Sequence, residues 1–195
     1  MSDFLETIKA VDGKIYNLGY HQKRYEKVLK SLGIDTFSNL QNFLSPPADG
    51  IYKCRVLYDE KSINIDYVKY TKRKIDTLKL VYDNNIEYSK KYTSREELDA
   101  LFEKREGCSD IIIVKNSLIT DTTIANIALY NGKEWLTPKR PLLNGTCRQR
   151  LLDEKKIIES DIEVNDIFKF KKIALLNAMI DFDIIPSNNL KDIIC

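Results

Sequence analysis

The sequence lacks a charge excess, a long apolar run and a regular cysteine pattern. Its 31 basic and 29 acidic residues leave a net charge of +2, which gives no electrostatic basis for binding nucleic acid. No apolar run approaches the ~18 residues of a membrane span, and the opening MSDFLETIKAV has no secretory-signal features. The four cysteines are irregularly spaced without a CxxC pair, so neither zinc nor a disulfide scaffold is indicated. These absences predict a protein of the reducing cytoplasm that binds no metal, membrane or nucleic acid.

Histidine is equally scarce, with His21 as its single occurrence. No Ser/His/Asp or Cys/His catalytic arrangement can be assembled around it, so we expect a structural or capping role at a helix start. Arg24 follows three residues later and would project from the first turn of that helix. Its guanidinium could reach an anion through a bidentate contact.

The chain has the composition of a folded protein, with 43% apolar residues, and its 195 residues suit one large domain or two small ones. Four pairs of strand-like runs are separated by turn signals such as Asp12-Gly13 and Asn131-Gly132, and each pair predicts a hairpin. The predicted hairpins cover 4–18, 51–70, 109–121 and 126–138.

Helical spacing and end signals predict the remaining elements. Ser94 with Glu97 forms a capping-box pattern for one of the helices. The predicted helices cover 20–33, 36–44, 93–107 and 144–154, with a strand at 75–82 and a short helix running into a strand over 166–182. Strands joined mostly as hairpins favour an α+β fold over a doubly wound sheet. The basic stretch at 71–74 is the best domain boundary, which gives domains 1–72 and 73–195.

Two segments carry candidate chemistry. LITDTTIANIALY, residues 118–130, places Asp121 among three threonines between strand-like runs. This is either a solvated turn or a pocket in which the acid faces a basic nitrogen. Asn144 to Cys147 open a helix, where unpaired N–H groups bind anions or are simply capped. Lys90 and Lys91 lie before another helix, where an amine facing a pocket could react with a carbonyl cofactor.

These pieces occur in a specific order. FLETIKAVDGKIYNLGYHQKR is followed by KKYTSR, ITDTTIANIAL, PLLNGTCRQRLL and LLNAM. In this order they resemble the class IV aminotransferase-like family of pyridoxal-phosphate enzymes, which includes branched-chain and D-amino-acid aminotransferases and 4-amino-4-deoxychorismate lyase. The match covers almost the whole chain. It implies a two-domain α+β fold of the D-amino-acid aminotransferase type, with a small N-terminal domain, a barrel-like C-terminal domain and pyridoxal 5'-phosphate between them.

The resemblance also implies roles for individual residues. The Schiff-base lysine falls on Lys91, because Arg95 completes the K-Y-T-S-R pattern that Lys90 lacks. The acid beside the pyridine nitrogen falls on Asp121, and the phosphate-binding arginine of the His-x-x-Arg pattern on Arg24. Lys9 is implied as a contact for the substrate carboxylate. The implied cofactor-binding set is Arg24, Lys91, Asp121, Thr123, Asn126, Thr146, Cys147 and Asn177.

Three positions depart from the family pattern. Asp121 stands where Glu is usual and is one methylene shorter, so the cofactor or the strand must lie closer. Cys147 stands where Thr is often found, which keeps a main-chain N–H and loses a hydroxyl. Lys9 replaces a common Arg and would meet a carboxylate as a point charge.

The resemblance leaves three functions open. The first is a lyase that converts 4-amino-4-deoxychorismate to 4-aminobenzoate and pyruvate for folate synthesis. The second is an aminotransferase acting on branched-chain or D-amino acids, although a second carboxylate-binding arginine pair is not evident. The third is a non-catalytic protein that keeps the fold. A homodimer acting on a small amino substrate is implied in the first two cases.

Overall fold

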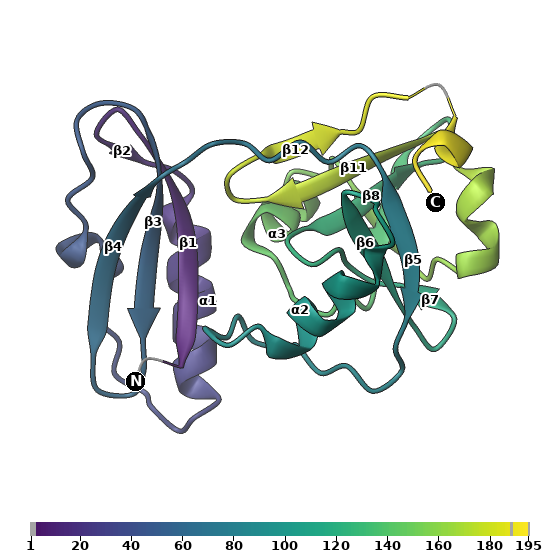
Figure 1. Ribbon diagram of the computed structural model, residues 1–195. Coiled ribbons are helices and arrows are strands. Elements are labelled where there is room, and N and C mark those ends of the chain that lie inside the picture. The colour runs from purple at the N-terminus through teal and green to yellow at the C-terminus, as the bar shows by residue number, and fades with distance from the viewer. Residues whose placement is uncertain (1–2, 188, 195) are drawn as a thin grey trace. The chain divides into compact units, whose positions relative to one another are not determined.

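The computed structural model describes residues 3–187 and 189–194 (Figure 1). The chain forms two compact units. The first comprises the chain up to Lys72 together with Lys90–Ser94, and the second comprises Arg73–Ser89 with the chain from Arg95 onward. The chain therefore leaves the first unit after Lys72 and returns to it for five residues, Lys90–Ser94. The single boundary expected after residue 72 does not include this return.

The first unit is built on a four-stranded antiparallel sheet with the order β2-β1-β3-β4. The predicted turn between the first two strands is confirmed, because Asp12 and Gly13 both adopt positive φ, at 48° and 76°. The predicted hairpin over 51–70 is also confirmed. The strands are β1 Phe4–Val11, β2 Lys14–Ile15, β3 Ile51–Tyr58 and β4 Ile63–Lys69.

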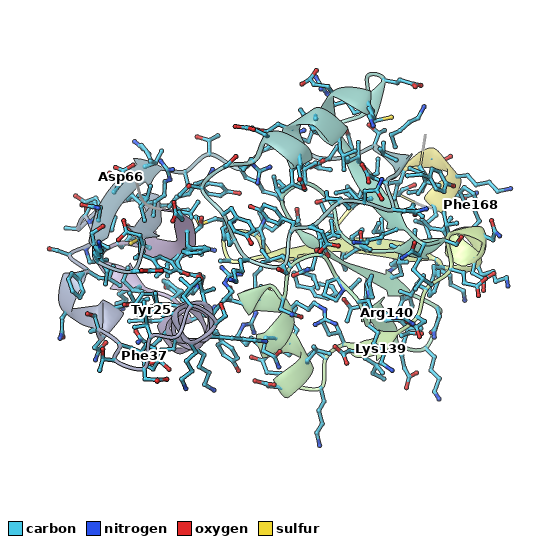
Figure 2. All side chains as sticks on the ribbon, turned by 90° about the horizontal axis from the view of Figure 1, so that it is seen from below. Tyr25, Phe37, Asp66, Lys139, Arg140 and Phe168 are labelled. Carbon is cyan, nitrogen blue, oxygen red and sulfur yellow. The ribbon has the colours of Figure 1, made fainter. Side chains whose placement is uncertain are left out.

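One face of this sheet is covered by α1, Leu18–Lys30, which buries Tyr25, Val28 and Leu29 (Figures 1 and 2). Strand β1 alternates between buried and half-buried positions, as a strand with one covered face does. The segment predicted to be helical over 36–44 forms only the short 3₁₀ turn η1, Leu40–Phe43, in which the Asn39 side chain accepts from the Gln41 N–H.

The second unit contains two sheets, which are not closed into a barrel. The larger has the order β10-β9-β8-β11-β12 and the smaller the order β5-β6-β7. The hairpins predicted over 109–121 and 126–138 are confirmed. The strands are β5 Leu78–Tyr82, β6 Asp110–Lys115, β7 Leu118–Ile119, β8 Asn126–Tyr130, β9 Trp135–Pro138, β10 Ile158–Ser160, β11 Lys172–Asn177 and β12 Asp181–Ile184.

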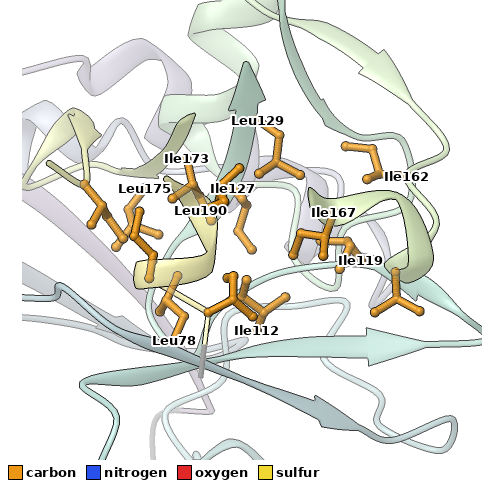
Figure 3. Close-up of a cluster of buried hydrophobic side chains, with 14 of the residues drawn as sticks. Leu78, Ile112, Ile119, Ile127, Leu129, Ile162, Ile167, Ile173, Leu175 and Leu190 are labelled. Carbon is orange, nitrogen blue, oxygen red and sulfur yellow. The ribbon is translucent and has the colours of Figure 1, made fainter. Parts of the chain in front are cut away.

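Aliphatic side chains from both sheets meet in one buried cluster (Figure 3). Leu78, Ile112, Val114 and Ile119 come from the smaller sheet, four members come from β8 and β11 of the larger sheet, and the others come from 3₁₀ helices and connecting segments. Burial of this apolar area drives the two sheets together. The labelled members from the larger sheet and its connections are Ile127, Leu129, Ile162, Ile167, Ile173, Leu175 and Leu190.

Two α-helices complete the second unit. The capping box expected at Ser94 is wrong, because α2 covers Glu96–Phe102, its N-cap is Arg95, and no side chain caps it. The first turn of α2 carries three acidic residues, which the helix dipole favours without a cap. The predicted helix over 144–154 is confirmed as α3, Thr146–Asp153. Short 3₁₀ helices are η2 Glu103–Arg105, η3 Val164–Lys169 and η4 Leu190–Asp192.

The predicted α+β class is confirmed by this mixture of antiparallel sheets and separate helices. Cys54 and Cys147 are free buried thiols. None of the helices in the described ranges combines the length and apolar character that crossing a bilayer requires.

Candidate functional site

Asp121 is a buried carboxylate just after β7, and both of its oxygens are engaged. Oδ1 accepts from Asn126 Nδ2 at 2.8 Å, and Oδ2 accepts from the Leu143 backbone N–H at 2.9 Å. Burial raises the pKa of Asp121 to about 6, and the bonds from Leu143 and Asn126 act against this rise. The solvated-turn interpretation is therefore wrong. The side chain is instead an acid that can hold or release a proton near neutral pH.

Asn126 connects this acid to the start of α3. Its Nδ2 donates to the Leu143 carbonyl at 2.8 Å as well as to Asp121. Its Oδ1 lies so close to Gly145 that a Cβ added there would be 1.9 Å away. Gly145 is the N-cap of α3, so the glycine is required by the close approach of Asn126.

The first turn of α3 suits an anion. Gly145 offers no capping side chain, and no acidic residue lies in the first turn. The first N–H groups of an α-helix have no intrahelical partner, and the helix dipole favours negative charge there. Thr146 and Cys147, both buried, are the first two residues of this turn. Burial raises the pKa of the Cys147 thiol to about 12, so it stays protonated and donates to the Asp181 carbonyl at 3.3 Å.

The loop between Asp121 and Asn126 is held from several directions. Thr123 Oγ1 donates to Asp110 Oδ1 at 2.7 Å, and the Thr123 carbonyl accepts from Arg95 Nη2 at 3.0 Å. Asn177 Nδ2 donates to the Ile124 carbonyl at 3.2 Å. The amide oxygen of Asn177 accepts from two N–H groups of the β11–β12 turn. The second unit therefore gathers most of the expected cofactor-binding residues around one loop, namely Asp121, Thr123, Asn126, Thr146, Cys147 and Asn177.

Arg24, in the first unit, is held by a buried acid that the sequence did not single out. Its Nε donates to Glu6 Oε1 at 2.7 Å and its Nη2 to Glu6 Oε2 at 2.6 Å. His21 Nδ1 lies 2.6 Å from the same Oε2. The capping role expected for His21 is wrong, because the helix begins at Leu18 and its N-cap is Asn17. His21 ends the first turn of the helix, Arg24 lies in the second turn, and both contact Glu6 of β1.

The charges in this cluster are unequal. Burial alone would raise the pKa of Glu6, but the charge of Arg24 and the hydrogen bonds from His21 and Arg24 outweigh it and hold the pKa at about 2. Burial lowers the pKa of His21, the contact with Glu6 acts in the opposite direction, and the charges of Arg24 and Lys91 lower it further. Glu6 and Arg24 are therefore an ion pair, and His21 is a neutral donor to it.

Lys91 belongs to the first unit, although it follows strand β5 of the second. Its carbonyl accepts from the Leu5 N–H at 2.9 Å, and its neighbour Tyr92 pairs with Phe4. Its charge acts on His21. The first unit thus brings together the expected amine, Lys91, and the expected phosphate-binding side chain, Arg24. Lys9 lies further along β1, half-buried and opposite Lys53 in the register.

Two acids were missed in the sequence. Glu6 could have been found, because it occupies an inward position of β1 between the apolar Phe4 and Ile8. Asp110 opens β6, whose first five positions are all buried, so alternation gives no signal there. Within residues 3–187 and 189–194, no group of three or more His, Cys, Asp or Glu residues is arranged to bind a metal ion.

The contact between Gly145 and Asn126 gives a stability prediction. Gly145→Ala should lower the free energy of unfolding by about 1–3 kcal/mol, because the added methyl group displaces the Asn126 side chain. Gly19→Ala is the matched control, since a Cβ there meets nothing within 4 Å in a helix that favours alanine. Combining Gly145→Ala with Asn126→Ala should cost less than the sum of the single changes in denaturant unfolding. Additive losses would show that the two residues do not conflict.

The low pKa of Glu6 predicts a pH dependence of stability. Because the folded pKa is about 2 and the reference value 4.5, the stabilisation is complete above pH 4.5 and is lost as the pH falls towards 2. Between those limits the wild type should lose about 3 kcal/mol more than Glu6→Gln, which has no titrating group. Denaturant unfolding at a series of pH values measures both curves. Parallel curves would mean that the Glu6 carboxylate is not selectively stabilised on folding.

Comparison with known proteins places this arrangement in a family. Residues 69–186 match the family model described as amino-transferase class IV. An uncharacterised protein from Haemophilus influenzae is 37% identical over 185 residues, which cover 92% of this chain and 98% of that protein.

Solved structures agree with the fold. A crystal structure from Haemophilus somnus, provisionally identified as a 4-amino-4-deoxychorismate lyase, is 32% identical with a TM-score of 0.85 and covers 92% of this chain and 97% of its own. The 4-amino-4-deoxychorismate lyase of Pseudomonas aeruginosa has a TM-score of 0.72 at 15% identity, covers 94% and 82%, and shows the fold alone. The fold type and the resemblance read from the motifs are confirmed, and the chain belongs to the class IV aminotransferase family.

Proposed function

We propose that this protein is a pyridoxal-phosphate-dependent lyase that converts 4-amino-4-deoxychorismate to 4-aminobenzoate and pyruvate. The observation that carries the cofactor assignment is the Asp121–Asn126–Leu143 network, which joins a buried acid to the uncapped start of α3. The similarity to the Haemophilus somnus protein, which extends over nearly the full length of both chains, supports the choice of reaction. The proposal includes folate synthesis, a cytoplasmic location and a homodimer.

The residues present fit this cofactor in their chemistry. A pyridine nitrogen needs an acid that shares its proton, and Asp121 has a pKa of about 6. Main-chain N–H groups and fixed cations both suit a phosphate, and the start of α3 in the second unit offers the former while Arg24 in the first unit offers the latter. An aldehyde needs a primary amine, which Lys91 provides. Asp121 is one methylene shorter than the usual Glu, and hydrogen bonds from the Leu143 N–H and the Asn126 side chain hold its carboxylate in place.

Pyridoxal phosphate, when bound, supplies an electron sink for the electron pair left after a proton is removed from the substrate. The protein residues bind, orient and move protons around it. Lys91 Nζ would hold the group at its aldehyde and supply the amine that takes up and returns a proton. Asp121 would hold a proton at the ring nitrogen, and the groups suited to a phosphate would be Arg24 in the first unit and the first turn of α3 in the second.

Chain connectivity supports the assignment of Lys91. Lys91 precedes Arg95 by four residues, so peptide geometry keeps their Cα atoms within about 14 Å. Arg95 donates to the carbonyl of Thr123, two residues after Asp121. Arg95 thus anchors the end of the lysine-bearing segment to the loop that carries the acid.

Transamination is the second candidate, favoured by the description of the family model. An aminotransferase-like structure from Mesorhizobium loti has a TM-score of 0.81 at 17% identity, which shows the fold alone. Both reactions begin with the same proton removal, so the residues named above serve either. The overall equations differ, because the lyase reaction balances without an acceptor and transamination requires a keto acid.

The cofactor assignment predicts a coloured protein. Purified protein incubated with pyridoxal 5'-phosphate should turn yellow and, after borohydride reduction, carry the cofactor on Lys91 in a peptide map. Lys91→Ala should abolish both signals, because it removes the reactive amine.

Lys90→Ala is the matched control for this experiment. Lys90 is the adjacent lysine, and its Nζ lies over the Phe4 ring at 5.7 Å from the centroid. This variant should keep the colour and the Lys91 adduct. A wild-type protein that stays colourless with added cofactor would rule out the enzyme and leave a non-catalytic protein that keeps the fold.

The reaction assignment predicts product formation without an acceptor. Loaded protein given 4-amino-4-deoxychorismate alone should release pyruvate and 4-aminobenzoate in equal amounts, measured by a coupled pyruvate assay and by chromatography. Lys91→Ala should reduce the rate by at least about 100-fold, since proton transfer by a positioned side chain contributes at least that much. If product forms only when a keto acid is added, the protein is an aminotransferase instead.

A further inference from the structure

We propose that Glu6 is a positioning residue that fixes the guanidinium of Arg24 for the phosphate of the cofactor, and that β1 sets the relative positions of Arg24 and Lys91. This inference rests on the proposed function and deepens it. It assigns a role to an acid that lies outside residues 69–186, the segment matched by the family model.

The contact between Glu6 and Arg24 fixes orientation as well as charge. The two carboxylate oxygens of Glu6 meet Nε and Nη2 of Arg24 at 2.7 and 2.6 Å, the two-pronged geometry that defines the plane of a guanidinium. These bonds use two of the five N–H donors of the guanidinium. His21 Nδ1, at 2.6 Å from Oε2, holds the carboxylate from a third direction.

Burial differs between the partners in a way that suits this role. The Glu6 side chain is fully buried, whereas the Arg24 side chain is 13% exposed. The acid is therefore sealed beneath the helix, and the cation extends from it towards the surface of the unit. The carboxylate can accept from the guanidinium with both oxygens only while it is ionised, and the low pKa of Glu6 keeps it ionised.

The same strand also fixes the segment that carries the amine. Leu5, the residue before Glu6, donates its N–H to the Lys91 carbonyl at 2.9 Å. Strand β1 is itself paired with β2 and β3, so its register is fixed. Two consecutive residues of β1 thus hold the two groups that the proposed function assigns to the aldehyde and the phosphate. A change in the position of β1 would move both.

A purely structural ion pair is the competing explanation, since Glu6 and Arg24 also join β1 to α1. The two explanations differ in ligand selectivity. A positioning residue for the phosphate contact should affect pyridoxal 5'-phosphate and leave pyridoxal, which has no phosphate, unaffected. Loss of a structural pair would weaken both ligands together.

The experiment compares Glu6→Gln with Asp66→Asn. Asp66 forms an ion pair with Arg55 at 3.5 Å. It lies on the exposed face of the sheet, and Tyr25 of α1 lies against the other face (Figure 2). Asp66→Asn is therefore a matched acid-to-amide change away from Arg24. Spectrophotometric titrations give the affinity of each folded variant for the two ligands. Glu6→Gln should lower the affinity for pyridoxal 5'-phosphate about tenfold or more, which is the effect of one charge-assisted contact. The affinity for pyridoxal should not change. Asp66→Asn should change neither affinity.

A second background tests whether Glu6 acts through Arg24. Arg24→Met removes the proposed phosphate contact directly. The double variant with Glu6→Gln should bind pyridoxal 5'-phosphate with the same affinity as Arg24→Met alone. Additional weakening in that background, or equal losses for both ligands, would overturn the positioning role. If Glu6→Gln does not fold, Glu6→Asp carries the same comparison, since it keeps the charge and is too short for the two-pronged contact.

The outcomes separate this inference from the function on which it rests. A wild-type protein that does not bind pyridoxal 5'-phosphate would remove the proposed function and this inference together. A wild-type protein that binds it, with Glu6→Gln matching Asp66→Asn in both titrations, would overturn the positioning role alone.

Discussion

A carboxylate that leaves water must find hydrogen-bond donors or cations, and each unit of this chain buries at least one. Glu6 meets a guanidinium and an imidazole, so its pKa falls to about 2 and it stays charged. Asp121 meets an amide and a backbone N–H, which oppose the effect of burial only in part, and its pKa rises to about 6. The two acids therefore have different uses. One is a fixed counter-charge, and the other can exchange a proton near neutral pH.

The surroundings of Asp121 follow from the need to hold a short acid with neutral hydrogen-bond donors. Its donors come from Leu143 and Asn126, and Asn126 in turn approaches Gly145 too closely for any side chain there. The residue before α3 must then lack a side-chain cap, which leaves the helix start open to an external anion. In this way one buried carboxylate accounts for both an acidic group and an anion-binding turn in the same unit.

Much of the fold could be predicted where local chemistry decides it. Asp12-Gly13 forms its turn because positive φ is required there, and the helix α1 follows its apolar spacing. Predictions failed where a local signal competed with tertiary contacts. Ser94 and Glu97 have the spacing of a capping box, but the helix begins at Glu96 and its N-cap is Arg95. The Arg95 side chain donates to the Thr123 carbonyl, a tertiary contact that the local pattern does not include. His21 faces a strand fifteen residues away, which no local pattern records. A buried partner for Glu6 could be predicted from the sequence, because an acid at an inward strand position needs a hydrogen-bond or charge partner.

The path of the chain ties these features together. Lys91 reaches the first unit only because the chain returns there for five residues, and that return is fixed by the bond from Leu5 and the pairing of Phe4 with Tyr92. The family-model match contains Lys91 and Asp121 but begins after β1 and α1. The residues that hold the lysine segment and the arginine therefore lie outside the part of the chain that carries the most recognisable motifs. The proposed function requires the amine and the phosphate contact at a fixed separation, so it makes β1 part of the proposed site together with the motif residues.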